Sequence, residues 1–336
     1  MKKTQVALAA LALVASTAAM ADVKVWGILD AGVASSTGKT EFFGAGNNGT
    51  TQFGINGSED LGNGLKANFN LVSGINVRNG ASGDNGGGNT NLFNRGASIG
   101  VSNETLGLTI GNQFSNAVLA GGFVTGGNAV GGDGINVPAA VRLFGGKPGA
   151  YATGGANNVF FIPQAVQASF NAAGFSGNVM YRVVDKSANE SGYTGATLST
   201  SVGGANLTVG YQEGSYTTAA SNYKSTFVAG NTSIGDVRLN AAFSNNTGAA
   251  KSNAYVLGAS MPLVGALSGS VNYANGTDTQ GTQTGVSLEY GLSKQTITYL
   301  NYLQFSKAGG GSAIANDGNL SITGKSLLTV GLKHAF

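Results

Sequence analysis

The chain lacks cysteine, has few charged residues and contains no long apolar run beyond its first 21 positions. Without cysteine there is no disulfide, no thiol nucleophile and no thiolate metal site. Charged residues make up only 10% of the chain, against roughly 25% in ordinary soluble domains. No apolar run after residue 21 reaches the roughly 18 residues that a spanning helix requires. These absences disfavour both an ordinary soluble enzyme and a bundle of membrane helices.

Groups that could carry catalysis or bind a cofactor are also scarce. A zinc site or a Ser-His-Asp triad would depend on the single histidine, His334, which lies almost at the chain end. Residues 44–49, Gly-Ala-Gly-Asn-Asn-Gly, satisfy the dinucleotide-binding pattern, but no buried strand precedes them and no helix follows. In a chain with 56 glycines such a match arises by chance. We therefore predict no catalytic residue, no cofactor and no metal site.

The first 21 residues have the pattern of a secretory signal peptide. Lys2 and Lys3 precede an apolar stretch at 6–14, and Ala-Met-Ala at 19–21 fits a small-x-small cleavage site. Cleavage there would leave a barrel domain of residues 22–336. Removing the two lysines leaves 16 of the 18 basic residues against 15 acidic ones, a net charge near +1. This balance does not predict a nucleic-acid partner.

Alternation of apolar and polar side chains predicts β-strands throughout the mature chain. The clearest case is 326–336, where one parity holds Leu328, Val330, Leu332, His334 and Phe336. Similar alternation runs through residues 23–33, 65–71, 179–183, 237–244 and 267–273. A membrane barrel can place a terminal aromatic residue in its interfacial girdle, so Phe336 is expected there.

The connections between these strands fall into two classes. Seven are short, at 59–63, 103–104, 171–175, 203–205, 233–236, 262–265 and 291–295. They interleave with eight mostly longer ones, at 35–48, 77–91, 114–154, 185–191, 214–222, 246–251, 275–280 and 307–324. Fifteen connections join 16 strands, with both termini on the side of the short turns. This is the layout of an outer-membrane barrel, with short periplasmic turns and longer outer loops.

The third long connection, at about 114–154, is much longer than the others. Structureless loops beyond about 12–15 residues are usually functional or disordered. In a barrel wide enough for water, such a loop can fold inward and constrict the lumen. It contains Asp133, Arg142 and Lys147, so an inward fold would bring few charges with it. A loop that stays on the outer surface is the alternative.

Several motifs make the chain resemble the Gram-negative general porins of the β-proteobacterial type. They are Trp-Gly-Ile-Leu-Asp-Ala-Gly-Val at 26–33, Phe-Gly-Ile-Asn-Gly-Ser-Glu-Asp-Leu-Gly at 53–62, Gly-Leu-Lys-Ala at 64–67, Leu-Phe-Asn-Arg at 92–95, Tyr-Gly-Leu-Ser-Lys at 290–294 and Val-Gly-Leu-Lys-His-Ala-Phe at 330–336. They occur in family order, whereas about 114–285 matches only in style. The resemblance implies 16-stranded homotrimeric diffusion channels, with interface strands near the two termini. It also implies that Phe336 is the assembly signal that the barrel assembly machinery of the outer membrane reads.

The predicted lumen carries charges of both signs. Channel-lining candidates are Lys24, Asp30, Gln52, Lys66, Arg78, Arg95, Asp133, Arg142, Lys147, Arg182 and Arg238. Family members often have Arg where this chain has Gln52, Asn112 and Gln295. Replacing a guanidinium, which stays charged at any working pH, with a neutral amide weakens the anion-attracting field. We therefore expect weak anion selectivity or near-neutrality.

The sequence thus predicts an all-β protein, a 16-stranded antiparallel transmembrane β-barrel with an inward-folded third loop. It would be an outer-membrane porin, in contact with lipid, through which small hydrophilic solutes and ions diffuse passively. One alternative is a substrate-specific channel for a sugar or a carboxylate, which would need an aromatic track or a dense charge cluster. The other is a secreted Gly-rich adhesin with a β-solenoid fold, which would need a fixed internal repeat.

Overall fold

The computed structural model describes residues 22–36, 39–83, 91–116, 118, 161–184, 192–215, 222–248, 252–276, 281–307 and 324–336. Within these ranges, a single sheet of 18 strands makes up the regular structure. The strands are β1 (Asp22–Ser36), β2 (Lys39–Phe43), β3 (Gln52–Gly62), β4 (Leu65–Ile75), β5 (Ser82–Gly83), β6 (Gly96–Ser102), β7 (Leu106–Phe114), β8 (Phe161–Ala172), β9 (Phe175–Arg182), β10 (Gly192–Val202), β11 (Ala205–Ser215), β12 (Tyr223–Ile234), β13 (Val237–Gly248), β14 (Ser252–Val264), β15 (Leu267–Gly276), β16 (Gly281–Gly291), β17 (Thr296–Phe305) and β18 (Ser326–Ala335).

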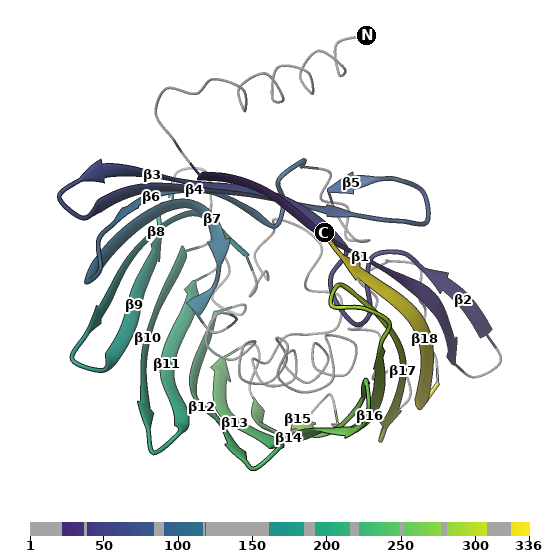
Figure 1. Ribbon diagram of the computed structural model, residues 1–336. Coiled ribbons are helices and arrows are strands. Elements are labelled where there is room, and N and C mark those ends of the chain that lie inside the picture. Colours follow the sequence, from purple (N-terminus) through teal and green to yellow (C-terminus); the bar gives the residue numbers. More distant parts are fainter. Residues whose placement is uncertain are drawn as a thin grey trace, which may run out of the picture.

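These strands close into a barrel with 16 positions around its ring. Apart from β2 with β3 and β5 with β6, neighbours along the chain pair antiparallel. Strand β18 pairs antiparallel with β1, so the sheet has no free edge there (Figure 1). Both β3 and β2 pair with β1, at its first and second halves, and therefore share one position in the ring. The two-residue strand β5 is an addition beside the end of β4. The prediction of an all-β, 16-stranded antiparallel barrel is confirmed.

Each of the seven short connections overlaps the range that the sequence predicts, although strands extend into several of those ranges, as β3 does to Gly62 in 59–63. Two-residue turns at 63–64, 173–174, 203–204, 235–236 and 265–266 join successive strands, and 103–105 and 292–295 are only slightly longer. Several of these turns place a residue at positive φ, where glycine has no Cβ penalty; Gly64 lies at 76° and Gly235 at 57°. Short turns of this kind hold adjacent strands in register without additional contacts.

Two of the longer connections differ from the prediction. Residues 35–48 are not one loop, because β1 continues to Ser36 and β2 starts at Lys39. The alternation in Lys-Thr-Glu-Phe-Phe is too short to be recognised as a strand without its partner, β1. The predicted connection at 77–91 likewise contains a strand, the two-residue β5, which pairs with the end of β4. Most of the third connection, with Asp133, Arg142 and Lys147, lies outside the described residues, as does the predicted signal peptide.

The outer face of the barrel is apolar, as the alternation predicts. In β18 the side chains of Leu328, Val330 and Leu332 are 40–50% exposed on the isolated chain, whereas Leu327 and Thr329 of the other parity are buried. Outward apolar side chains recur on every long strand, so a continuous band is available to lipid.

The inner face is less uniformly polar than predicted. Inward positions do include buried Ser, Asn, Thr and Gln side chains, such as Ser244, Asn272 and Gln283. They also include apolar side chains, of which Phe227, Met180 and Leu303 belong to three separate buried clusters. Period-two alternation therefore identified the lipid-facing parity correctly but overstated the polarity of the opposite face.

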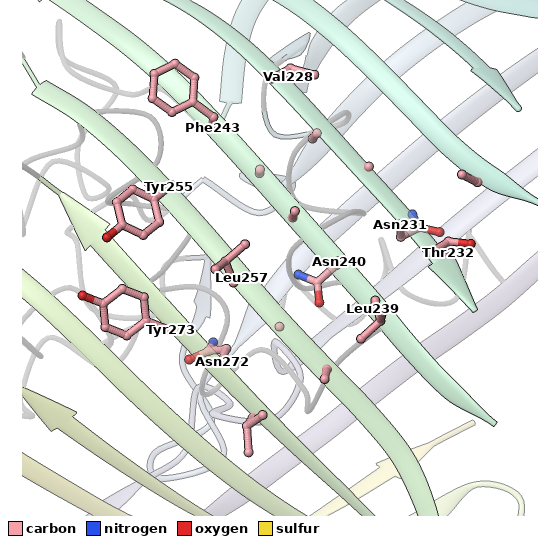
Figure 2. A pocket seen from close by; sticks show the side chains of 18 of the residues that line it. Val228, Asn231, Thr232, Leu239, Asn240, Phe243, Tyr255, Leu257, Asn272 and Tyr273 are labelled. Carbon is pink, nitrogen blue, oxygen red and sulfur yellow. The ribbon is translucent and has the colours of Figure 1, made fainter. Parts of the chain in front are cut away.

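Among the described residues, no helix is both long and apolar enough to cross a membrane. A hollow of about 1040 Å³ lies over β11–β16. Phe243, Tyr255 and Tyr273 project along it in Figure 2, and the two tyrosine rings are 5.9 Å apart between centroids. Since Phe243 and Tyr255 have the exposed, lipid-facing parity, this hollow belongs to the outer surface and not to the lumen.

Candidate functional site

The β-ladder between β1 and its neighbour is interrupted at Asp30. Residues 22–28 of β1 pair with β3 and residues 32–36 pair with β2, which leaves 29–31 without a strand partner on that side. The hydroxyl of Thr51 fills this gap. Its Oγ1 accepts a hydrogen bond from the Asp30 N–H at 2.9 Å and donates one to the Asp30 carbonyl at 2.8 Å. A single side chain thus satisfies two buried backbone groups that a ladder would otherwise pair.

Between β2 and β3 the chain leaves the wall and runs inside the barrel. We call residues 44–51 the inward segment; every one of them is buried. Its base is closed by a hydrogen bond from the Thr51 N–H to the Ala45 carbonyl, at 3.0 Å. Gly46 has a φ of 97°, and a Cβ there would overlap the carbonyl oxygen of Gly49, so the turn requires glycine.

The inward segment wraps around the carboxylate of Asp30, a side chain with no solvent exposure. Oδ2 of Asp30 accepts the backbone N–H groups of Asn47, Asn48 and Gly49 at 3.1, 2.5 and 2.7 Å. Oδ1 accepts the Tyr299 hydroxyl at 2.6 Å. Successive N–H groups that converge on one oxygen form an anion-binding nest. The glycine-rich stretch 44–49 does bind an anion, but that anion is the protein's own aspartate.

Side chains of the inward segment reach strands far from its own position in the ring. Asn47 Nδ2 donates to Thr329 Oγ1 on β18 at 2.5 Å, and Asn48 Nδ2 donates to Glu289 Oε1 on β16 at 2.9 Å. Lys333 Nζ on β18 donates to the Asn48 carbonyl at 3.2 Å. In the ring, β1, β18 and β17 lie between the position of β2 and β3 and that of β16. Four strand spacings of about 4.8 Å are therefore crossed on the inner side, a path of roughly 19 Å.

A second group of contacts joins the end of the inward segment to Arg95. The Arg95 Nε donates to Oε1 of Gln52, the first residue of β3, at 2.8 Å. The Arg95 guanidinium carbon lies 5.2 Å from the centroid of the Phe161 ring. A weaker contact runs from Arg95 to Thr50 Oγ1 at 3.4 Å. The amide oxygen of Gln52 thus serves as an acceptor for the guanidinium of Arg95.

The third connection begins by turning inward. Ser115 and Asn116, which follow β7, are fully buried. The Asn116 N–H donates to the Tyr193 hydroxyl on β10 at 3.1 Å, and its side-chain amide contacts Asn178 on β9. Both strands lie beyond β8 in the ring, so the chain crosses the inner face of β8. The first residues of the third connection therefore agree with an inward path.

The remaining lumen candidates lie at the ends of the strands. Lys24 forms an ion pair with Asp22 at 3.2 Å, and Lys66 lies opposite Asp60 in the β3–β4 register. Lys24 lies near the start of β1, whereas Lys66 and Arg238 follow the short turns at 63–64 and 235–236. Arg182 lies at the opposite end, where its guanidinium donates to Gln164 Oε1 at 3.2 Å.

Arg78 is an exception among the candidates. Its guanidinium donates to the Phe42 carbonyl at the β1–β2 hairpin, and its side chain is exposed. Among the described residues no three His, Asp or Glu side chains gather in a way that could hold a metal ion.

Phe336 completes the seam at which the barrel closes. Its N–H and carbonyl exchange two hydrogen bonds of 3.0 Å with the carbonyl and N–H of Gly27 on β1. The aromatic ring covers Gly27, where a Cβ would overlap it, and is 52% exposed. This places the ring on the outer parity, where the sequence predicts an interfacial aromatic.

Sequence reasoning missed most of the residues that hold these two inward elements in place. Tyr299, Asn47, Asn48 and Thr51 had no assigned role, and Asn116 and Tyr193 were not singled out. One signal was available for Tyr299: it shares its parity with Asn301, while Leu300 and Tyr302 occupy the apolar parity. A tyrosine of polar parity is expected to face the lumen.

Comparisons with known proteins place this barrel in a family. The chain matches the family described as Gram-negative porin over residues 7–310. An outer membrane porin protein of Bordetella pertussis is 36% identical over 133 residues, a stretch that covers 34% of this chain and 34% of that protein. The match thus spans about a third of the length of this relative.

Solved structures agree on the fold. The anion-selective porin from Comamonas acidovorans is 20% identical, with a TM-score of 0.68 over 94% of this chain and 100% of that one. OmpF of Salmonella typhi, in complex with daunomycin, is 14% identical, with a TM-score of 0.69 over 94% and 97%. The chain belongs to the Gram-negative porin family, as an integral β-barrel of the outer membrane.

Proposed function

We propose that this protein forms water-filled channels through which small hydrophilic solutes and ions diffuse passively across the outer membrane. The observation that carries the proposal is the closed ring of 16 strand positions with an apolar outer face. A closed ring satisfies the backbone within lipid, and a barrel of this size encloses an aqueous lumen. No bond is made or broken in such transport, so the protein acts as a channel and not as an enzyme.

The charges on the inner face support weak anion selectivity or near-neutrality. Inward cations such as Arg95 and Arg182 are hydrogen-bonded to glutamine oxygens, and Lys24 is paired with Asp22. Asp30 is fully covered, so permeating ions do not contact its carboxylate. The anion-selective Comamonas acidovorans porin is consistent with this sign, although its likeness to the chain is one of fold.

Planar bilayer recording in a salt gradient tests both parts of this proposal. The purified protein should insert in steps of uniform conductance, and its reversal potential should show at most a modest preference for anions. Bilayers that stay silent would refute the channel itself. A strong preference for either sign would refute only the selectivity.

The proposal includes a homotrimer and a cleaved signal peptide. A structure of Vibrio cholerae OmpT in its trimer form shares the fold, with a TM-score of 0.62 over 94% of this chain and 12% identity. Asp22, the expected first residue of the mature chain, is also the first residue of β1. N-terminal sequencing of the native protein and cross-linking in membranes would test cleavage and trimer formation separately. Conductance increments that come in threes would agree with the trimer.

A role for Phe336 as the signal read by the barrel assembly machinery also belongs to this proposal. Its support is the exposed ring at the closing seam. Because the ring covers Gly27 on β1, recognition would precede the step in which β18 meets β1.

A further inference from the structure

We propose that the inward segment, residues 44–51, is a second constriction of the channel, and that Asp30 is the anchor that holds it across the lumen. This inference rests on the proposed channel function and deepens it. A constriction is ordinarily sought in a long loop, whereas this segment interrupts one strand position, between β2 and β3.

The first argument is the path of the segment. It leaves the wall between β1 and β4 and bonds to Thr329, Lys333 and Glu289 on β18 and β16. All three are on the inward parity of their strands, because the alternate residues Leu328, Leu332 and Leu288 are exposed on the outer face. The backbone of the segment therefore occupies cross-section that the lumen would otherwise have.

The second argument is the position of the segment relative to the third connection. The start of that connection is fastened to β9 and β10 through Asn178 and Tyr193. Thr329 on β18 bonds to Asn47 of the inward segment, and Tyr299 on β17 bonds to Asp30, the residue that the segment wraps around. The inward segment leaves the wall after β2 and the third connection leaves it after β7, only three ring positions apart. The strands to which they are fastened, β18 and β10, are eight positions apart in a ring of sixteen, so the two elements are attached to opposite walls. Two elements that are attached to opposite sides of the lumen narrow it more than one element does.

The third argument concerns what Asp30 does. Three backbone N–H groups and one hydroxyl direct their protons at its carboxylate, and no part of the side chain is exposed. Hydrogen bonds to a charged acceptor contribute more than neutral ones, so this cradle is the strongest attachment of the segment. Asp30 is therefore a positioning residue and not a charge that permeating ions meet.

Two substitutions of Asp30 test the inference, because they distinguish its role as a hydrogen-bond acceptor from its role as a charge. Asp30→Ala removes every acceptor and should free the segment, which would raise single-channel conductance by about 1.5-fold or more, since conductance follows the open cross-section. Asp30→Asn keeps an oxygen that can accept the three N–H groups, so it should restore most of the wild-type conductance. Its reversal potential should also stay at the wild-type value, which the loss of a lumen charge would not allow.

A second variant changes the segment without altering β1. Gly46→Ala forces a Cβ onto the Gly49 carbonyl at a φ of 97° and should open the channel as Asp30→Ala does. Its matched control is Gly64→Ala, which meets the same type of backbone strain, at 76°, but has nothing within 4 Å of the new Cβ. Heat-modifiable gel migration and circular dichroism would establish that each variant is folded.

The outcomes separate the inference from the channel function. Higher conductance in Asp30→Ala and Gly46→Ala, with faster uptake of larger neutral sugars into vesicles, supports a constriction. If Asp30→Ala does not fold, Gly46→Ala decides. Folded variants that conduct as the wild type does would overturn the constriction while leaving the channel intact. A wild-type protein that does not conduct at all would overturn both.

Discussion

The contact between Thr51 and Asp30 allows a sharp prediction about stability. The Thr51→Val substitution keeps the shape of the side chain but removes its hydroxyl. Both residues are fully buried, so the N–H and the carbonyl of Asp30 would lose their partner without access to water. An unsatisfied buried group costs about 1–3 kcal/mol, and two groups together should lower the free energy of unfolding by about 2–6 kcal/mol.

The single tryptophan of the chain provides the assay. Trp26 lies on β1 next to this site, and its ring covers Gly54 on β3, where a Cβ would lie 2.5 Å from the ring. Its fluorescence should therefore report the separation of β1 from β3 during urea unfolding of the barrel folded in phospholipid vesicles. The midpoint for Thr51→Val should fall below that of the wild type with an unchanged slope.

Two controls make the result interpretable. Thr51→Ser retains the hydroxyl and should recover most of the lost stability. Thr232→Val removes an exposed hydroxyl with a long 3.4 Å contact to the Gly204 carbonyl, and should change stability by about 0.5 kcal/mol or less. If Thr51→Val proves as stable as the wild type, the reasoning that Thr51 replaces a missing ladder bond is wrong.

Three further predictions concern assembly and permeation. Deleting Phe336 removes both hydrogen bonds to Gly27 and should reduce the amount of folded barrel in the outer membrane; unchanged levels on fractionation would contradict its role at the seam. The Gln52→Arg substitution should shift the reversal potential toward anion preference, and an unshifted potential would mean that permeating ions do not sense position 52. The Asn116→Ala substitution should loosen the start of the third connection and increase open-channel current noise, whereas noise equal to the wild type would show that this contact does not hold it.

The barrel itself could be predicted from local sequence. At 326–336, which form β18 and Phe336, the alternation of apolar and small or polar residues is a property of eleven consecutive positions, and any strand between lipid and lumen must follow it. The short turns could be predicted equally well, because Asn and Gly adopt the positive φ that a turn of two or three residues requires. The β1–β2 hairpin could not be predicted in this way, since the five residues of β2 form a strand only through pairing with β1.

The candidate site was predicted only in part. Parity placed Asp30 and Gln52 on the inner face, but it could not show that Gln52 accepts a hydrogen bond from Arg95. It also could not show that Asp30 is covered. Asp30 is covered by residues 44–51, a glycine-rich segment whose composition predicts neither helix nor strand. The position of this segment is set by hydrogen bonds to residues far away in the sequence.

The sequence by itself therefore determined the strand periodicity, the turns, the lipid-facing parity and the family, because each depends on residues close together in the chain. The tertiary structure alone decided where residues 44–51 run. Tyr299 is 269 positions from Asp30, and Glu289 is 241 positions from Asn48. These partners meet only when β18 closes on β1, so the anchored segment across the lumen is a consequence of barrel closure.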